Sequence, residues 1–191
     1  MELTIELLDR LAMEARVKDS RPGWLKQLPG SVRPSQRYYR FLFLLCRELR
    51  PGKVLELGVC RGVSGFHLAA GVRPNSGHVW GVDCNPQLIP KQLLARTDYT
   101  FILGEAVRAA PKLARQGPFD VIFFDTVHLK EQITDEVAVY TEMMSRPGLQ
   151  LFDNLRAYDM GEFWAELEGE KTRMDWLCTG GRGGFGARIV R

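Results

Sequence analysis

Polar side chains that could bind a cation follow two hydrophobic runs in the second half of the chain. Asp125 comes directly after residues 121–124, and Asp153 and Asn154 come directly after residues 149–152. If these runs are neighbouring parallel strands, the three side chains meet at one edge of the sheet, because parallel strands end at the same edge. Two carboxylates and an amide oxygen suit a hard cation such as Mg²⁺. The alternative is that Asp125 caps a loop and that Asp153 and Asn154 form a turn.

His128 follows Asp125 by three residues and is a candidate general base. An imidazole titrates near neutrality, so it can take a proton from a hydroxyl that a bound cation has made more acidic. The alternative is that His128 only orders its loop or stacks against a ligand. The other histidines, His67 and His78, are expected to be structural.

Glycines after the hydrophobic run 54–57 indicate a ligand site. Gly58, Gly62 and Gly65 have the spacing G-x-x-x-G-x-x-G. Glycines at a strand-to-helix turn let the backbone approach a ligand closely at the carboxyl end of the strand. The fingerprint of dinucleotide-binding proteins is the tighter G-x-G-x-x-G, which directs backbone amides at a pyrophosphate. A nucleoside ligand without a pyrophosphate is therefore favoured over the cofactor of an NAD-dependent dehydrogenase.

The next two hydrophobic runs also end in residues suited to a nucleoside. Asp83 lies about 20 residues after the glycine turn, where a carboxylate can accept hydrogen bonds from both ribose hydroxyls. Gly104 and Glu105 follow the run 100–103, where a backbone amide or an acid can meet an adenine ring. Taken singly, such an acid could equally be a helix cap. The three strand ends together, in this order, favour a nucleoside-type ligand.

The pattern of hydrophobic runs predicts an α/β fold. Near-continuous hydrophobic strands alternate with helical stretches, as in a parallel sheet covered on both faces, and the expected strands are 53–58, 78–83, 100–104, 119–125 and 149–154. Two last strands, 174–178 and 186–190, are joined by the glycine-rich turn 179–184 and should pair antiparallel at the sheet edge. That turn could instead be an RNA-binding tail. Helices are expected at 4–18 and 36–49.

Length and composition fit one domain of 191 residues, with N-terminal helices in 1–50 and the core in 51–191. The formal charge of +3 is far from that of a dedicated nucleic-acid binder. The four cysteines are scattered, which indicates neither a disulfide framework nor a structural zinc site and favours reduced, buried thiols. With no signal peptide and no apolar run of about 20 residues, a cytoplasmic protein without a membrane partner is expected.

Several of these motifs together resemble one enzyme family. The segments are VLELGVCRGVSG at 54–65, the strand end at Asp83, LGEA at 103–106, FDVIFFDTVH at 119–128 and LQLFDN at 149–154. They are similar to the S-adenosylmethionine (SAM)-dependent O-methyltransferases of the catechol and caffeoyl-CoA type, and to related bacterial enzymes acting on sugars and antibiotics. The resemblance covers residues 34–156 and implies a Rossmann-like three-layer sandwich with a seven-stranded, mainly parallel sheet.

The resemblance also implies roles for individual residues. Asp125, Asp153 and Asn154 would occupy the metal-ligand positions, and Asp125 and His128 would be the catalytic residues. Catechol and caffeoyl-CoA members have a lysine base where this chain has His128, whereas the bacterial members often have a histidine there. The SAM-binding residues would be Glu56, Gly58, Cys60, Gly62, Ser64, Asp83, Gly104, Glu105 and Asp125.

The leading hypothesis is therefore metal-assisted methyl transfer from SAM to a hydroxyl group of a small molecule, without a nucleic-acid partner. One alternative is a SAM-dependent methyltransferase that needs no metal, and another is a non-catalytic SAM-binding module. Phe163, Trp164 and the turn near Gly181 could wall an acceptor pocket or belong to the core. The resemblance is compatible with a homodimer, with the N-terminal helices as the candidate contact.

Overall fold

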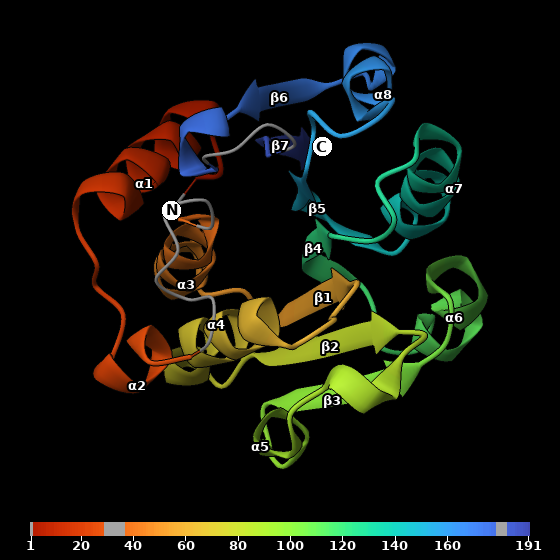
Figure 1. Ribbon diagram of the computed structural model, residues 1–191. Helices are drawn as coiled ribbons and strands as arrows, with labels where there is room; N and C mark the ends of the chain where they lie inside the picture. The colour runs from red at the N-terminus through yellow and green to blue at the C-terminus, as the bar shows by residue number, and fades with distance from the viewer. Residues whose placement is uncertain (1, 29–36, 179–182) are drawn as a thin grey trace.

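A seven-stranded sheet forms the centre of the computed structural model, which describes residues 2–28, 37–178 and 183–191 (Figure 1). The strand order is β3-β2-β1-β4-β5-β7-β6. Strands β1 to β5 pair in parallel, and β7 pairs antiparallel with both β5 and β6, so the predicted mainly parallel sheet is confirmed. The strands are β1 Lys53–Leu57, β2 His78–Asp83, β3 Tyr99–Leu103, β4 Phe119–Phe124, β5 Met144–Asp153, β6 Glu170–Arg173 and β7 Phe185–Val190.

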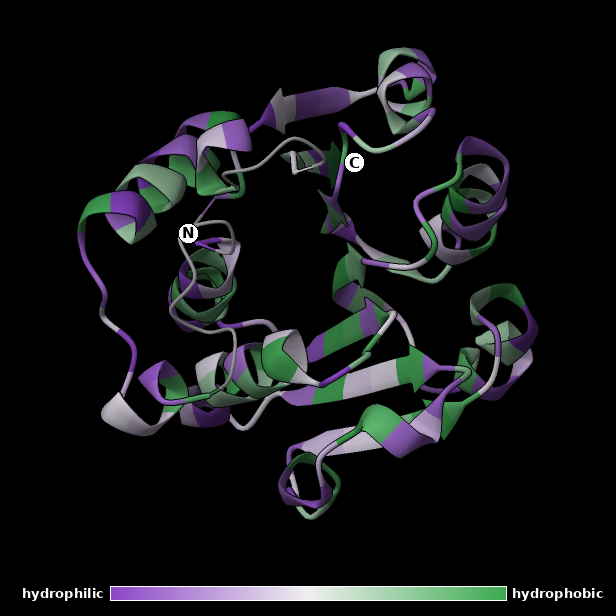
Figure 2. Cartoon of the chain, viewed as in Figure 1, coloured by the Kyte–Doolittle hydropathy of each residue, from purple (hydrophilic) through white to green (hydrophobic). Residues whose placement is uncertain are grey.

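Helices cover both faces of this sheet. One hydrophobic cluster joins α1, α3 and α4 to the sheet, and a second joins α6, α7 and α8 to the opposite face (Figure 1). Figure 2 shows hydrophobic residues along the central strand β4 and hydrophilic residues along the edge strand β6. The helices are α1 Ile5–Val17, α2 Gly23–Lys26, α3 Tyr38–Leu49, α4 Val63–Val72, α5 Lys91–Leu94, α6 Ala106–Leu113, α7 Lys130–Thr141 and α8 Met160–Glu166, with short 3-10 turns at Arg73–Asn75 (η2), Pro86–Leu88 (η3) and Asp175–Leu177 (η4).

The N-terminal helix prediction is confirmed in α1, where the Thr4 side chain accepts a hydrogen bond from the backbone N–H of Leu7 and so caps the helix. The second predicted helix corresponds to α3, but its expected start at 34–36 lies outside the described residues. Within the described ranges, no helix combines the length and hydrophobicity that a membrane span needs.

One strand was predicted in the wrong place. Residues 174–178 contain the 3-10 turn η4, and the edge partner of β7 is the more hydrophilic β6. Asp175 causes the difference, because its carboxylate accepts hydrogen bonds from the Phe185 backbone and from the Arg156 and Arg173 side chains, which fold the chain back. Leu177 is thereby buried in the core. Most of the glycine-rich turn, 179–182, lies outside the described residues.

The sheet topology creates a crevice between β1 and β4. From β1 the chain proceeds outward to β2 and β3, and it then returns to build β4 and β5 on the other side. Such a reversal of strand order leaves a crevice at the carboxyl ends of the strands, where α/β proteins bind ligands. Backbone hydrogen bonds fix this edge, since Gly58 N donates to Val82 O and Asp125 N donates to Leu57 O.

Candidate active site

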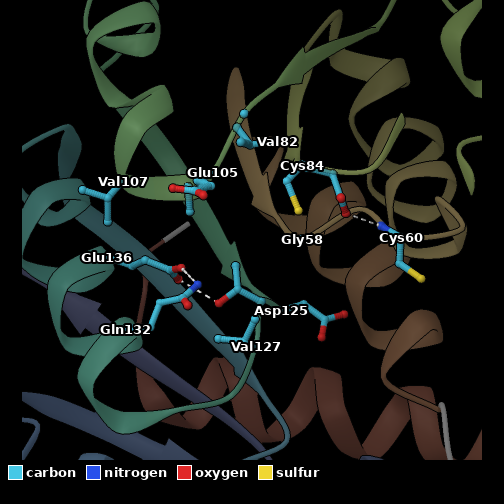
Figure 3. Close-up of a pocket in the computed structure, with 14 residues that line it drawn as sticks. Gly58, Cys60, Val82, Cys84, Glu105, Val107, Asp125, Val127, Gln132 and Glu136 are labelled. Atoms are coloured by element: carbon cyan, nitrogen blue, oxygen red, sulfur yellow. Dashed lines mark hydrogen bonds between the residues drawn. The ribbon is translucent and has the colours of Figure 1, made fainter. Parts of the chain in front are cut away.

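A cavity of about 560 Å³ opens at the carboxyl ends of the first four strands (Figure 3). Six of the predicted cofactor-binding residues line it, and they are Gly58, Cys60, Asp83, Gly104, Glu105 and Asp125. The residues at the ends of the first four strands, which the sequence assigned to one site, therefore line a single cavity.

Gly58 makes the turn after β1 possible. Its φ is +89°, and a Cβ built on it would lie 1.9 Å from the carbonyl oxygen of Asp125. A residue with a side chain cannot occupy this position without moving the backbone of the β4 loop. Gly58 thus holds the β1 side of the cavity against the loop that carries Asp125.

Asp83 clamps the same turn. Its Oδ2 accepts hydrogen bonds from the backbone N–H groups of Val59 at 2.9 Å and Cys60 at 2.7 Å, the latter drawn in Figure 3, and its Oδ1 accepts one from Asn85 at 2.7 Å. An ionised carboxylate has about four acceptor positions. Asp83 therefore orders the loop and keeps acceptor capacity toward the cavity.

Two members of the predicted polar trio contact His128, and the third contacts one of those two. The Nε2 atom of His128 lies 3.1 Å from Asp125 Oδ1 and 3.3 Å from Asn154 Nδ2, and the backbone N–H of Asn154 donates to Asp153 Oδ1 at 2.7 Å. If Nε2 carries its proton and donates to Asp125, the Asn154 amide has to turn its oxygen toward the ring, since two donors cannot share this contact. The structure therefore brings the three predicted side chains together, and the His128 imidazole contacts two of them.

This cluster does not form a ready metal cage from charged ligands. Among the described residues, no group of three or more His, Cys, Asp and Glu side chains is arranged to hold a metal ion. A cation at the trio would therefore depend on two carboxylates and on the amide oxygen of Asn154 as its third protein ligand.

Unusual backbone conformations gather in the loops after β4 and β5. His128, Asn154 and Tyr158 have φ values of +60°, +55° and +43°. Non-glycine residues in this region cost free energy and cluster at functional sites. The two loops are joined by a hydrogen bond from the Lys130 backbone N–H to Asp159 Oδ1 at 2.8 Å.

Comparison with known proteins identifies the family to which this arrangement belongs. Residues 55–155, more than half of the chain, match the family described as "Methyltransferase domain". The chain belongs to this methyltransferase family. No curated protein shows significant similarity to the whole sequence.

Solved structures of methyltransferases share the fold. Cofactor-bound Rv0187 from MTB is 24% identical, with 97% of this chain and 90% of that chain covered and a TM-score of 0.67. PaMTH1 from Podospora anserina, bound to S-adenosylhomocysteine (SAH), is 17% identical, with coverage of 100% and 98% and a TM-score of 0.68. TomG from Streptomyces achromogenes, an O-methyltransferase of tomaymycin synthesis in complex with SAM, is 19% identical, with coverage of 99% and 92% and a TM-score of 0.68.

Three predicted cofactor residues of this methyltransferase lie behind the cavity wall. Glu56 is fully buried and accepts a hydrogen bond from the Tyr99 hydroxyl at 3.2 Å, and burial raises its pKa to about 8. Ser64 is buried and hydrogen-bonds to Glu56. Gly62 has a φ of +68° and packs against Leu93. Because α4 packs directly against this part of the sheet, these residues support the turn from behind.

Sequence reasoning missed many of the other residues that line the cavity. The residues that it did not select are Val82, Cys84, Ala106, Val107, Thr126, Val127, Gln132 and Glu136. Val107 and Val127 are 38% and 51% exposed, and exposed hydrophobic side chains in a cavity are suited to a planar ligand ring. Gln132 and Glu136 are four residues apart on α7, which places them on one helix face, but only the packing of α7 brings that face to the cavity.

Two tyrosines at the start of α3 were also missed. Tyr38 hydrogen-bonds to Asp153 from within the core, and its ring stacks on Phe185 with centroids 5.4 Å apart. The Cys178 thiol donates to Asp153 Oδ1 at 3.8 Å. Tyr39 stacks on His67 instead. The contacts of Tyr38 with Asp153 and Phe185 span more than 100 residues of sequence, so no local pattern indicates them.

The titrating groups influence one another. Burial raises the pKa of Asp153, and the negative charge of Asp125 raises it further. Burial lowers the pKa of His128, but the hydrogen bond and charge of Asp125 outweigh this, so the pKa of His128 is raised. The site therefore has two carboxylates that repel each other and an imidazole held by one of them.

The other residues considered in the sequence analysis lie away from the cavity or outside the described residues. Phe163 and Trp164 are buried beside Phe152 and are not among the residues that line the cavity at the strand ends, although Phe163 lines a separate pocket beside α7 and α8. Gly181 lies outside the described residues. His67 is buried with its ring nitrogens near Val63 O and Arg21, as expected of a structural residue. His78 starts β2, at the end away from the cavity.

The cysteine prediction holds for only half of the thiols. Cys46 and Cys178 are buried, whereas Cys60 and Cys84 are exposed and line the cavity. The reason is that Cys84 directly follows β2 and Cys60 lies in the turn after β1, where side chains leave the core.

Proposed function

We propose that this chain transfers a methyl group from SAM to a hydroxyl oxygen of a small molecule. One observation carries the proposal: Asp125 both lines the cavity and contacts His128 at 3.1 Å, so the cofactor wall adjoins a candidate base. SAM and SAH occupy TomG and PaMTH1, which share this fold. Transfer occurs when the acceptor oxygen attacks the methyl carbon, the carbon–sulfur bond breaks and SAH leaves with the electron pair of that bond.

His128 would receive the hydroxyl proton. When Nε2–H donates to Asp125, the lone pair of the neutral ring is on Nδ1, which becomes the proton acceptor. Asp125 then fixes the orientation of the ring and stabilises the imidazolium that forms, as a carboxylate does in a catalytic triad.

We propose in addition that Asp125, Asp153 and Asn154 hold a divalent cation. The donor set fits, because these are hard oxygen ligands and because a cation would offset the repulsion between the two carboxylates. A bound cation would orient the acceptor hydroxyl and lower its pKa. The contact between His128 and Asp125 supports the second candidate, a methyltransferase in which the Asp–His pair alone activates the acceptor.

An activity panel separates these two candidates. We expect SAH to form from SAM when the acceptor is one of a set of hydroxylated small molecules. The rate of SAH formation should fall at least about tenfold in EDTA and recover when Mg²⁺ is added. Asp153→Asn should then require more Mg²⁺ for half-maximal activity. Activity that survives EDTA unchanged would support the metal-independent candidate, and no turnover with any acceptor together with no SAM binding would contradict both.

Cofactor binding can be measured without knowing the acceptor. Because Cys60 and Cys84 line the cavity while Cys46 and Cys178 are buried, a maleimide should modify two thiols in the native protein. Saturating SAH should slow both reactions by about tenfold or more, since a bound ligand excludes the reagent. Mass spectrometry of peptides assigns each site. SAH that binds by calorimetry yet leaves both labelling rates unchanged would place the cofactor elsewhere.

A further inference from the structure

The part of the cavity between α6 and α7 includes the polar side chain of Gln132, to which the proposed chemistry gives no role. The Tyr140 hydroxyl donates to Ala106 O at 2.6 Å and ties α7 to the start of α6. On the α6 side the cavity is lined by Ala106 and Val107, whose side chains cannot form hydrogen bonds. Glu105 is 62% exposed and pairs with Arg108 at 3.0 Å.

The polar side chains of this part come from α7 and from the loop after β4. Gln132 lines the cavity and donates from Nε2 to Glu136 Oε1 at 2.7 Å, and the Thr126 hydroxyl donates to Glu136 Oε2 at 2.9 Å (Figure 3). Glu136 borders the cavity but has no solvent-exposed surface, because Gln132 and Thr126 cover its carboxylate, so Gln132 is the member of the pair that a ligand can reach. A carboxylate only accepts hydrogen bonds, and this fixes which way the Gln132 amide faces.

With one N–H engaged by Glu136, the Gln132 amide still has its carbonyl oxygen and a second N–H. This acceptor and donor pair matches adenine, in which a 6-amino donor stands next to a ring-nitrogen acceptor, and glutamine pairs with adenine in this manner in protein–DNA complexes. Hypoxanthine has a 6-oxo acceptor in place of the amino group. The exposed side chains of Val107 and Val127 line the same cavity and provide apolar contacts for the purine faces.

We infer that Gln132 is the residue that distinguishes a 6-aminopurine nucleoside from its 6-oxo counterpart, and that Glu136 and Thr126 position its amide. The inference rests on the proposed function, since it assigns the adenine end of SAM to this wall. Gln132 contacts the ligand, whereas Glu136 is a positioning residue that acts through Gln132.

The test compares the binding of SAH and S-inosylhomocysteine by calorimetry. The wild-type protein should bind SAH at least about tenfold more tightly than the inosyl compound. Gln132→Met, which keeps the length of the side chain but removes the amide, should weaken SAH binding by about tenfold and bring the two ligands within about twofold of each other. Glu136→Gln should reduce the preference partly, because an amide at 136 allows the Gln132 amide to face either way.

Glu131→Gln is the matched control, because it removes the same charge from an exposed position on the same helix, outside the cavity. Its preference for SAH should equal that of the wild type, and thermal unfolding should show that every variant folds. Equal binding of both ligands by the wild type, or an unchanged preference in Gln132→Met, would overturn the inference alone. Failure of the wild type to bind either ligand would overturn the proposed function and this inference with it.

Discussion

Replacing Asp125 with asparagine is expected to lower the rate of methyl transfer by about a thousandfold while the protein remains folded. Asp125 contacts His128, lines the cavity and belongs to the proposed metal-binding trio, so the charge that this substitution removes has three proposed roles. Asparagine keeps the shape of the side chain, and removing the charge of the partly exposed Asp125, which repels the buried Asp153, should not destabilise the fold. SAH formation under single-turnover conditions measures the loss.

The same variant should change the pH dependence of the residual activity. His128 acts as a base only when it is neutral, so activity falls as the pH drops through the pKa of His128, which Asp125 raises. Without that negative charge the pKa falls, and the acidic limb of the profile should move to lower pH. Asp135→Asn, on the exposed side of α7, is the control and should leave both rate and profile unchanged. Full activity in Asp125→Asn would exclude Asp125 from the chemistry.

The second large effect concerns stability. Gly58→Ala is expected to lower the free energy of unfolding by about 3 kcal/mol or more, because a left-handed φ and a contact with backbone must both be relieved. A loss of that size corresponds to a fall in melting temperature of roughly 10 °C for a chain of this length. SAH affinity should fall as well, since the displaced backbone belongs to the cavity wall.

Gly161→Ala is the matched control for this substitution. Gly161 lies in α8, and a Cβ there would have its nearest neighbour at 3.9 Å. Alanine favours a helix over glycine, so this variant should gain about 0.5–1 kcal/mol. Thermal and chemical unfolding of both variants provides the comparison. A Gly58→Ala protein as stable as the wild type would mean that the turn after β1 tolerates a different backbone path.

Much of the fold and half of the site were predictable from the sequence for one physical reason. A buried parallel strand needs a continuous hydrophobic run, and the residue after the run leaves the core at the carboxyl edge of the sheet. Gly58, Asp83 and Asp125 could therefore be assigned to one edge from their positions along the chain alone, and the structure places all three on the cavity wall.

The sequence by itself determined the α/β class, the strand ends and the residue types available at one edge. Only the tertiary structure decided which side of the turn Glu56 and Ser64 occupy, that His128 lies between Asp125 and Asn154, and that α7 turns Gln132 toward the cavity. Local patterns encode burial and turns, whereas these placements depend on how helices pack across a sheet, and residues distant in the sequence fix that packing together.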